Sequence, residues 1–437
     1  MRGYTDGAVI RRGITLNDLW QYVLIYLSLL TPGSTFVFMC GGTWFYMMLL
    51  GLFVLSCLFS KRYRESYGIC LSALLLVNTL VARALNGGVG LDALMGFVGC
   101  VLVVQMAICC DYANFLRRWL ATVVTFAAIS IVFWIVCCVA PSVSSALLGP
   151  SFVVDVIGTY PWHTYEYGRG LFLYSWFNIH QFRNCGIFTE PGKYQVVLNS
   201  ALFILLFWKS NIHFKSERHF NLALLIIAFA IVTCQSTTGY IGALSCVLFY
   251  ILFKKEGDGS GIKGKLLAIL ILIAIGLLIQ YWADPSDSIL TTQILNKLFG
   301  GSSGIDLSNG TGSYRSGMID VCLRLIIDNP LGVGYDVLFA TAASSGDGLV
   351  AAAFVAYAAV YGLIPWAIVL FVIFYPVFKG QRLSSALLFV LLFINTTLAQ
   401  THFLYTGLLI IPAYLAIGHG WPLRMEGVKY SKWKDRW

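Results

Sequence analysis

Three charged residues, Arg183, Glu190 and Lys193, lie together in the polar segment RNCGIFTEPGKY, which precedes a long apolar run. The planar guanidinium of an arginine holds phosphate oxygens in pairs, whereas a lysine acts as a point charge. A glutamate can orient or deprotonate a hydroxyl group. These residue types suit a transfer reaction in which a phosphate group leaves and a hydroxyl attacks.

The same residues also have structural interpretations. Arg183 has no acidic residue within four positions, and a salt bridge to Glu190 requires the loop to fold back. Thr189 can cap a helix whose first turn holds Glu190 and Pro191, and the glutamate then stabilises the positive end of the helix dipole. Ligand binding and structural support are therefore alternatives for both charged residues.

Two further arginines, Arg315 and Arg324, lie in the helical pattern SYRSGMIDVCLRLIIDNP. Asp320 and Asp328 are four residues before and after Arg324, so we expect an ion-paired Arg324 and a weaker role in substrate binding. Arg315 lies about half a turn away on an apolar stripe, with no acidic residue three or four positions after it. Arg315 is therefore the better ligand-binding candidate. The stripe consists of Met318, Ile319, Cys322 and Ile326.

The remaining candidates are hydroxyl, histidine and carboxylate groups at expected helix ends. Ser236 and Thr237, in QSTTGY, can cap a helix or bind an anion through its free N–H groups. His402 and Asp347 are further candidates for acid–base chemistry. The sequence has no metal-ligand spacing, P-loop or dinucleotide-binding motif, so we expect neither a metal nor another cofactor.

The composition places these residues in a membrane protein. Of 437 residues, 58% are hydrophobic and 11% charged, whereas a soluble domain carries about 25% charge. Apolar runs long enough to cross about 30 Å of hydrocarbon recur along the chain. The net charge of +9 fits basic loops held in the cytoplasm rather than nucleic-acid binding, and the 12 cysteines are interpreted as core residues. Because residues 1–18 are polar, we expect no cleavable signal peptide.

We predict about twelve membrane helices in a single domain of residues 1–437. They are expected at residues 19–38, 43–60, 68–85, 91–110, 118–140, 193–209, 220–235, 238–253, 265–283, 348–378, 383–400 and 402–418. With both termini in the cytoplasm, few basic residues face outward, as the positive-inside rule requires. Those that do are Arg83, Arg169, Arg183, Lys193, Lys297, Arg315 and Arg324. Two outer loops, residues 141–192 and 284–347, are long enough to be folded and functional.

These motifs, in this order and topology, resemble the O-antigen polymerase and ligase superfamily, the Wzy-type polymerases of bacterial surface polysaccharide. The resemblance rests on RNCGIFTEPG before one membrane helix and STTGYIG at the start of another. It also rests on YRSGMIDVCLRLIIDNPLGVGYD in the second outer loop and on YGLIPW at residues 361–366. It covers about residues 180–380, and the earlier half of the chain matches only in hydropathy.

The resemblance implies an all-α, GT-C-like membrane fold and a metal-independent glycosyltransferase at the outer face of the cytoplasmic membrane. Donor and acceptor would both be oligosaccharides linked to undecaprenyl pyrophosphate, within membrane lipid. A chain-length regulator protein is an expected partner. Arg183 and Arg315 match the outer-loop arginines of the family, which would grip the donor pyrophosphate or the glycan. Tyr335 lies in a matching segment and is a further substrate-binding candidate.

One departure bears on the branch of the superfamily. The ligase branch has a histidine and an asparagine just before the helix that holds its YGLIP-like segment, whereas this chain has SSGDGLV, with Asp347. The departure favours a polymerase over a ligase that transfers finished glycan to another acceptor. A flippase for lipid-linked oligosaccharide is a third alternative. It would need a charged cavity across the membrane, and the predicted spans are almost free of charge.

Overall fold

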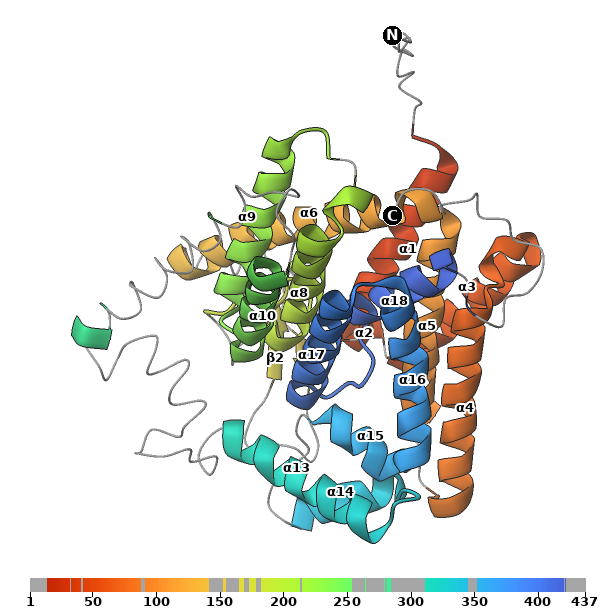
Figure 1. Cartoon of the computed structure of the whole chain (residues 1–437). Helices are drawn as coiled ribbons and strands as arrows, with labels where there is room; N and C mark the ends of the chain where they lie inside the picture. The colour runs from red at the N-terminus through yellow and green to blue at the C-terminus, as the bar shows by residue number, and fades with distance from the viewer. Residues whose placement is uncertain are drawn as a thin grey trace.

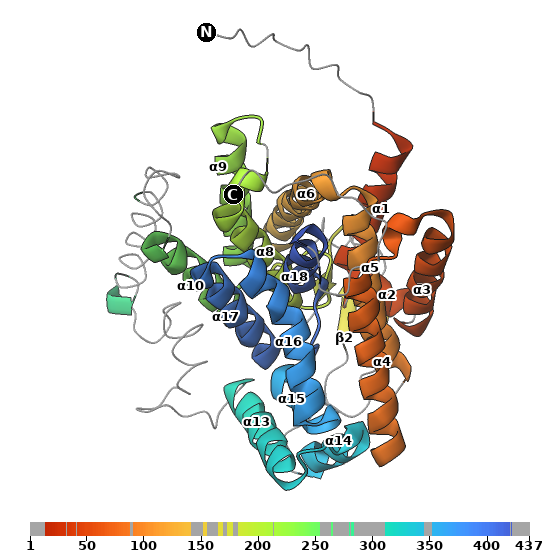
Figure 2. The same ribbon diagram turned by 45° about the vertical axis from the view of Figure 1, so that its right-hand side comes forward.

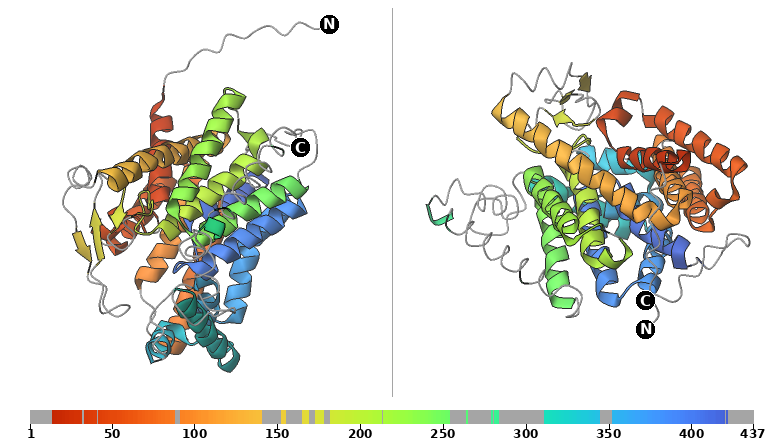
Figure 3. Two further views of the ribbon diagram at one scale, coloured as in Figure 1. Left: turned by 90° about the vertical axis from the view of Figure 1, so that its left-hand side faces the viewer. Right: turned by 90° about the horizontal axis from the view of Figure 1, so that it is seen from above.

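The structure is a computed structural model in which a bundle of helices carries a small β-sheet at its side (Figures 1 and 3). It describes residues 14–31, 33–40, 42–87, 91–140, 152–154, 165–168, 173–177, 182–212, 214–253, 264, 279, 281–283, 311–344, 352–419 and 421. The predicted coarse class, a helical membrane protein, is therefore correct apart from this small sheet. The predicted segment 265–283 lies almost wholly outside the described residues, as do large parts of both predicted outer loops.

The first half of the chain consists of helices and a short sheet. The helices are α1 (Leu16–Leu30), α2 (Thr35–Cys40), α3 (Gly42–Phe59), η1 (Lys61–Tyr63), α4 (Ser66–Asn86), α5 (Leu91–Cys110), α6 (Tyr112–Val139) and α8 (Pro191–Phe207). The strands, all in the first predicted outer loop, are β1 (Phe152–Val154), β2 (Tyr165–Gly168) and β3 (Trp176–Phe177). They pair antiparallel in the order β1-β2-β3, with Phe152 opposite Tyr167 and Tyr167 opposite Phe177.

The second half is helical throughout its described parts. Its helices are η4 (Lys209–Asn211), α9 (Glu217–Cys234), α10 (Thr237–Phe253), α13 (Thr311–Asp328), α14 (Gly334–Ser344), α15 (Ala353–Tyr361), α16 (Leu363–Gly380), α17 (Leu383–Ala399) and α18 (Thr406–His419). Within the described residues, 5 helices are long and apolar enough to cross a membrane: α3, α4, α6, α9 and α16. Shorter apolar helices complete the bundle.

Two predicted membrane helices are interrupted. The segment predicted at 19–38 divides into α1 and α2, and the turn between them contains Gly33 with φ +88°. The segment predicted at 348–378 divides into α15 and α16 at Gly362, with φ +95°. A positive φ is incompatible with a right-handed helix, and glycine adopts it without the steric cost of a Cβ atom. Both predicted continuous helices were therefore wrong.

The core is centred on α5, α8 and α18. Every residue from Pro191 to Leu206 in α8 is buried, and α18 is buried from Thr406 to Ile417. A helix that is apolar all round has no face suited to water, so it stays inside the bundle. The surrounding helices keep apolar side chains on their outer surfaces, including Val54, Leu80 and Phe371, which suits contact with lipid acyl chains.

The connections between helices gather at two opposite ends of the bundle. We call the end formed by residues 31, 33–34, 182–190, 235–236 and 400–405 the loop end. The opposite end, formed by residues 60–65, 208–212, 214–216 and 381–382, is the basic end. In the described residues, the basic end carries Lys61, Arg62, Arg64, Arg117, Arg118, Lys209, Lys215, Arg218, Lys379 and Arg382, and the loop end carries Arg83, Arg183, Lys193 and Arg324. The structure thus separates these cations into the two groups that the sequence assigned to opposite sides.

A buried ionic network fastens α1 to the start of α6 at the basic end. Arg118 is hydrogen-bonded to Asp18 and to the side chain of Gln21, and it pairs with Asp111 at 2.9 Å. The Arg118 side chain is only 8% exposed. Its two carboxylate partners therefore supply the compensation that a buried guanidinium requires.

At the loop end, α13 and α14 lie across the bundle, packed on α15 and α4 (Figures 1 and 2). The turn between α13 and α14 is bonded to the break between α15 and α16. The N–H of Val333 donates to the carbonyl of Ala359 at 2.9 Å, and the N–H of Leu363 donates to that of Pro330 at 2.9 Å. Two motifs of the resemblance, IIDNPLGVGYD and YGLIPW, therefore pack directly on each other.

Candidate functional site

The polar segment before α8 is held at the loop end by Asn184. Its side-chain amide donates to the hydroxyls of Ser130 in α6 and Thr233 in α9, at 3.1 and 3.0 Å. Its backbone N–H donates to the carbonyl of Thr233 at 2.9 Å, and its side-chain oxygen accepts from the N–H of Gly186. A single buried asparagine thus positions the residues on either side of it, among them Arg183.

Arg183 lies over the junction between α9 and α10. Its Nε donates to the carbonyl oxygen of Cys234, the last residue of α9, at 3.2 Å. Partial burial lowers the pKa of Arg183, and among the charges that oppose this effect is that of Glu190. Arg183 and Glu190, seven residues apart in the sequence, are therefore close enough in space to interact electrostatically.

Glu190 occupies the N-cap position of α8, and Pro191 follows as its first residue. The expectation that Thr189 is the cap was wrong, because its N–H and Oγ1 instead both donate to the carbonyl of Gly33, each at 3.0 Å. The Glu190 side chain makes no capping hydrogen bond to α8. Side-chain capping therefore does not explain this carboxylate, although it still lies at the positive end of the helix dipole.

Lys193 lies in the first turn of α8, three residues after Glu190. It is 5% exposed, and its ammonium group donates to Thr189 Oγ1 at 2.9 Å. A Cβ atom on Gly33 would lie 2.9 Å from the Lys193 Nζ, so glycine at this position leaves the space that the lysine occupies. Burial and the charge of Lys193 lower the pKa of His402 to about 3. His402 is therefore neutral at physiological pH and can accept a hydrogen bond.

The turn between α17 and α18 covers the start of α8. Gln400 lies directly against Gly192, and its carbonyl accepts from the N–H of Ala353, the first residue of α15, at 3.2 Å. The same turn carries His402, which lies 5.7 Å from Tyr405 between ring centroids. Three segments that are distant in sequence thus meet at the N-terminus of α8.

Tyr405 is a candidate that sequence reasoning missed. It is 3% exposed, and the charge of Glu190 is one of the factors that raise its pKa. The available signal was its place in QTHFLYT, a polar segment that also contains His402 and lies at the start of the helix predicted at 402–418. In the structure that helix begins only at Thr406. Buried tyrosines in apolar surroundings are common, so the sequence alone gave no reason to choose this one.

The remaining predicted site residues are Ser236, Thr237, Tyr335, Asp347 and Arg315. Ser236 Oγ accepts from the N–H of Gly239 at 3.4 Å, so it caps α10, and Thr237 is the first residue of that helix. Tyr335, in α14, packs edge-on against Tyr361 at 6.0 Å. Asp347 lies outside the described residues, and Arg315 is placed in α13 without a description of its side chain.

In α13 the predicted apolar stripe is buried, as expected, whereas the predicted ion pair of Arg324 with Asp320 and Asp328 does not form. Met318 and Cys322, on the predicted apolar stripe, are 2% and 0% exposed, whereas Arg324 is exposed. Within the described residues, the salt bridges involve Arg118 and Lys209, so Arg324 is paired with neither Asp320 nor Asp328. All three exposed groups are solvated, which weakens attraction between them.

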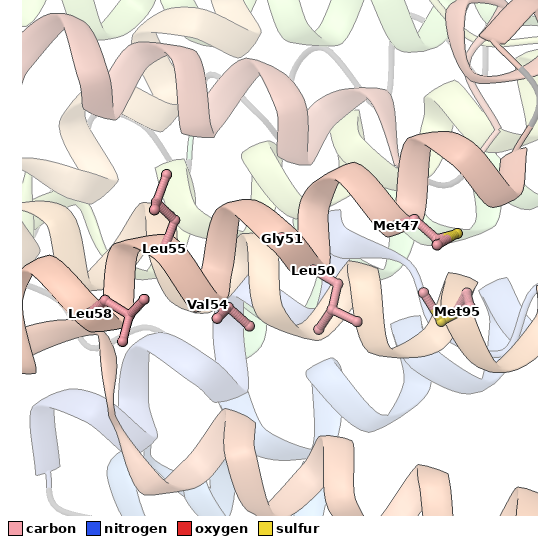
Figure 4. Close-up of a pocket in the computed structure, with 7 residues that line it drawn as sticks. All are labelled: Met47, Leu50, Gly51, Val54, Leu55, Leu58 and Met95. Carbon is pink, nitrogen blue, oxygen red and sulfur yellow. The ribbon is translucent and has the colours of Figure 1, made fainter.

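One pocket of the described residues lies elsewhere. It is an apolar groove along α3, closed at one side by Met95 of α5 (Figure 4). Met47, Leu50, Val54 and Leu58 line it, so it offers no polar group to a reacting substrate and resembles the lipid-facing surface around it. Among the described residues, the cluster of polar groups at the loop end is therefore the better candidate for a functional site. We define this cluster as Arg183, Glu190, Lys193, His402 and Tyr405.

Comparison of the chain with protein-family models, curated proteins and solved structures finds no match. In the described residues, no three histidine, cysteine, aspartate or glutamate side chains are grouped so as to hold a metal ion. The function must therefore be argued from the cluster itself.

Proposed function

We propose that this protein is a polymerase of bacterial surface polysaccharide. It would transfer a growing glycan from undecaprenyl pyrophosphate to the terminal sugar of another lipid-linked repeat unit. The observation that carries the proposal is the convergence of Arg183 and Glu190 at the N-terminus of α8. A cation suited to a leaving phosphate would then act within electrostatic range of a carboxylate suited to an attacking hydroxyl.

The proposed reaction assigns each group a task. A hydroxyl oxygen of the acceptor sugar forms a bond to the anomeric carbon of the donor, and the bond from that carbon to the pyrophosphate oxygen breaks. The acceptor proton passes to the Glu190 carboxylate. Arg183 stabilises the negative charge that develops on the departing undecaprenyl pyrophosphate, and Arg315 would assist from α13. The hydrogen bond from Lys193 to Thr189 would hold the first turn of α8, and so the backbone of Glu190, in place.

The distribution of cations supports an outward orientation for the loop end. Most of the described lysines and arginines are at the basic end, and basic loops remain in the cytoplasm. The loop end would then face the compartment in which lipid-linked repeat units are assembled into polymer. Both termini would be cytoplasmic, because α1 begins at the basic end and α18 finishes there.

The test is reconstitution of purified protein with a single substrate in the presence of EDTA. Given only the undecaprenyl-pyrophosphate repeat unit of the producing bacterium, the protein should form a ladder of longer glycans. Formation of product only after addition of a lipid core or a protein acceptor would instead identify a ligase. Translocation of the repeat unit across vesicles without elongation would identify a flippase.

A further inference from the structure

The side chain of Tyr405 ends in a hydroxyl group that is not paired. The residue is 3% exposed, and its hydroxyl has no hydrogen-bond partner among the described residues. Thr401 and the backbone of His402 lie close enough to lower the pKa of Tyr405 against the effect of burial, but neither meets the distance and angle requirements of a hydrogen bond. A buried polar group without a partner costs stability, and phenylalanine would fill the same space without that cost.

The position of this hydroxyl is fixed by the helix that follows it. Thr406 Oγ1 lies 2.6 Å from the carbonyl oxygens of both Ser28 and Thr31, at the end of α1. The carbonyl of Tyr405 accepts from the N–H groups of Leu408 and Leu409, at 3.1 and 2.9 Å. The backbone is therefore held from two directions, and the packing around the buried ring restricts the rotamers of Tyr405.

The surroundings of Tyr405 separate it from other buried tyrosines. The hydroxyl of Tyr67 is also unpaired and buried, but Tyr67 lies at the start of α4, near the basic end. Tyr405 instead lies within the electrostatic reach of Glu190 and against the ring of His402. Burial and the Glu190 carboxylate both raise the pKa of Tyr405, so the hydroxyl stays protonated and can donate a hydrogen bond.

We propose that Tyr405 is a binding residue for the acceptor sugar, whose oxygen atoms supply the hydrogen-bond partner that its hydroxyl lacks in the free protein. The assignment rests on the proposed function. Arg183 contacts the junction between α9 and α10, whereas Tyr405 and His402 lie at the turn between α17 and α18, and both Arg183 and Tyr405 interact electrostatically with Glu190. The acceptor is therefore assigned to the side of the α17–α18 turn. It reaches the buried hydroxyl once the side chains of Thr401 and His402 turn aside.

The test compares Tyr405→Phe with Tyr67→Phe in the purified full-length protein. Each change removes one unpaired buried hydroxyl, so neither should lower the melting temperature. The donor is the undecaprenyl-pyrophosphate repeat unit at fixed concentration, and the acceptor is the same repeat unit as a soluble alkyl glycoside. We expect Tyr405→Phe to raise KM for the soluble acceptor about tenfold, as for one lost hydrogen bond, while KM for the donor is unchanged. Tyr67→Phe should change neither constant.

Each other outcome overturns a separate claim. A lower melting temperature for Tyr405→Phe means that the hydroxyl has a protein partner, which removes the basis of the inference. A change in KM for the donor alone reverses the assignment of the two sides. Equal kinetics for the two variants and the wild type eliminate Tyr405 but leave the polymerase intact. If the wild-type protein elongates no lipid-linked repeat unit, the proposed function itself fails, whatever the variants do.

Discussion

A Cβ atom on Gly332 would lie 2.6 Å from the backbone nitrogen of Gly362, so these two glycines allow two backbone segments to meet without side chains between them. Gly332 follows α13, and Gly362 separates α15 from α16. The contact therefore joins the helix that carries Arg315 to the bundle. Through α15, which begins beside Gln400, it also connects that helix to the cluster.

Replacement of Gly362 by alanine should disrupt the contact between the α13–α14 turn and the break between α15 and α16. Its φ of +95° costs a residue with a Cβ atom roughly 1–3 kcal/mol, and that atom would also lie 2.6 Å from the carbonyl oxygen of Leu331. We expect a lower melting temperature in detergent and reduced polymer. Gly51→Ala is the matched control, because a Cβ there meets nothing within 4 Å. Equal melting temperatures for the two variants would contradict the role of this contact.

Arg183 should be irreplaceable by lysine. An ammonium group cannot hold two phosphate oxygens in one plane, so Arg183→Lys should lower the polymerisation rate about 10²-fold, the scale of a lost charge-stabilising group. Membrane abundance should be close to normal. Arg324→Ala, which removes an exposed and unpaired arginine, is the control and should retain activity. The assignment fails if Arg324→Ala is inactive and Arg183→Lys is active, as measured by glycan length on gels.

Glu190→Gln tests the carboxylate against its structural alternative. The substitution retains size and hydrogen bonding but removes the base, and the native side chain makes no capping bond that could be lost. We expect a fall of about 10²-fold in the rate with little change in melting temperature. A rate near that of the wild type, combined with a lower melting temperature, would restrict Glu190 to interaction with the helix dipole.

The neutral state of His402 predicts a pH dependence of stability. Its pKa is about 3 in the folded protein and 6.5 in the reference state, so the unfolded chain binds the proton more strongly. The contribution of His402 to the free energy of unfolding is therefore fully present above pH 6.5, and it is lost progressively as the pH falls from 6.5 towards 3. The melting temperature of His402→Gln should therefore fall less between pH 7.5 and 5 than that of the wild type. Parallel curves would show that His402 is solvated.

The orientation can be tested with an impermeant thiol reagent on intact spheroplasts. Cys40 is exposed at the loop end, so the background should carry Cys40→Ser. Asn329→Cys, at the loop end, should react from outside, whereas Ser216→Cys, at the basic end, should react only after permeabilisation. Labelling of Ser216→Cys in intact cells would reverse the orientation and remove the cluster from the outer face.

From the sequence, only those members of the cluster could be predicted whose role depends on neighbouring residues in the chain. Arg183 and Glu190 stood out because charges are rare in this chain and because a helix start follows them. Tyr405 was not predictable, since its position depends on the bond from Thr406 to Thr31, 375 residues earlier. The break at Gly362 was missed for a similar reason. A glycine inside an apolar run permits a helix, and the approach of the Leu331 backbone decides against it.

The bridge between Arg118 and Asp18 has a consequence for biogenesis. The partners are 100 residues apart, so α1 emerges from the ribosome long before its ionic partner exists. At about 5–20 residues per second, the first helix waits for at least about 5 s. During that time Asp18 lacks its arginine partner, and its charge favours an aqueous surface over the hydrocarbon. Asp18 thus keeps its end of α1 at the bilayer surface, without fixing the helix to the bundle, until Arg118 has been synthesised and can pair with it.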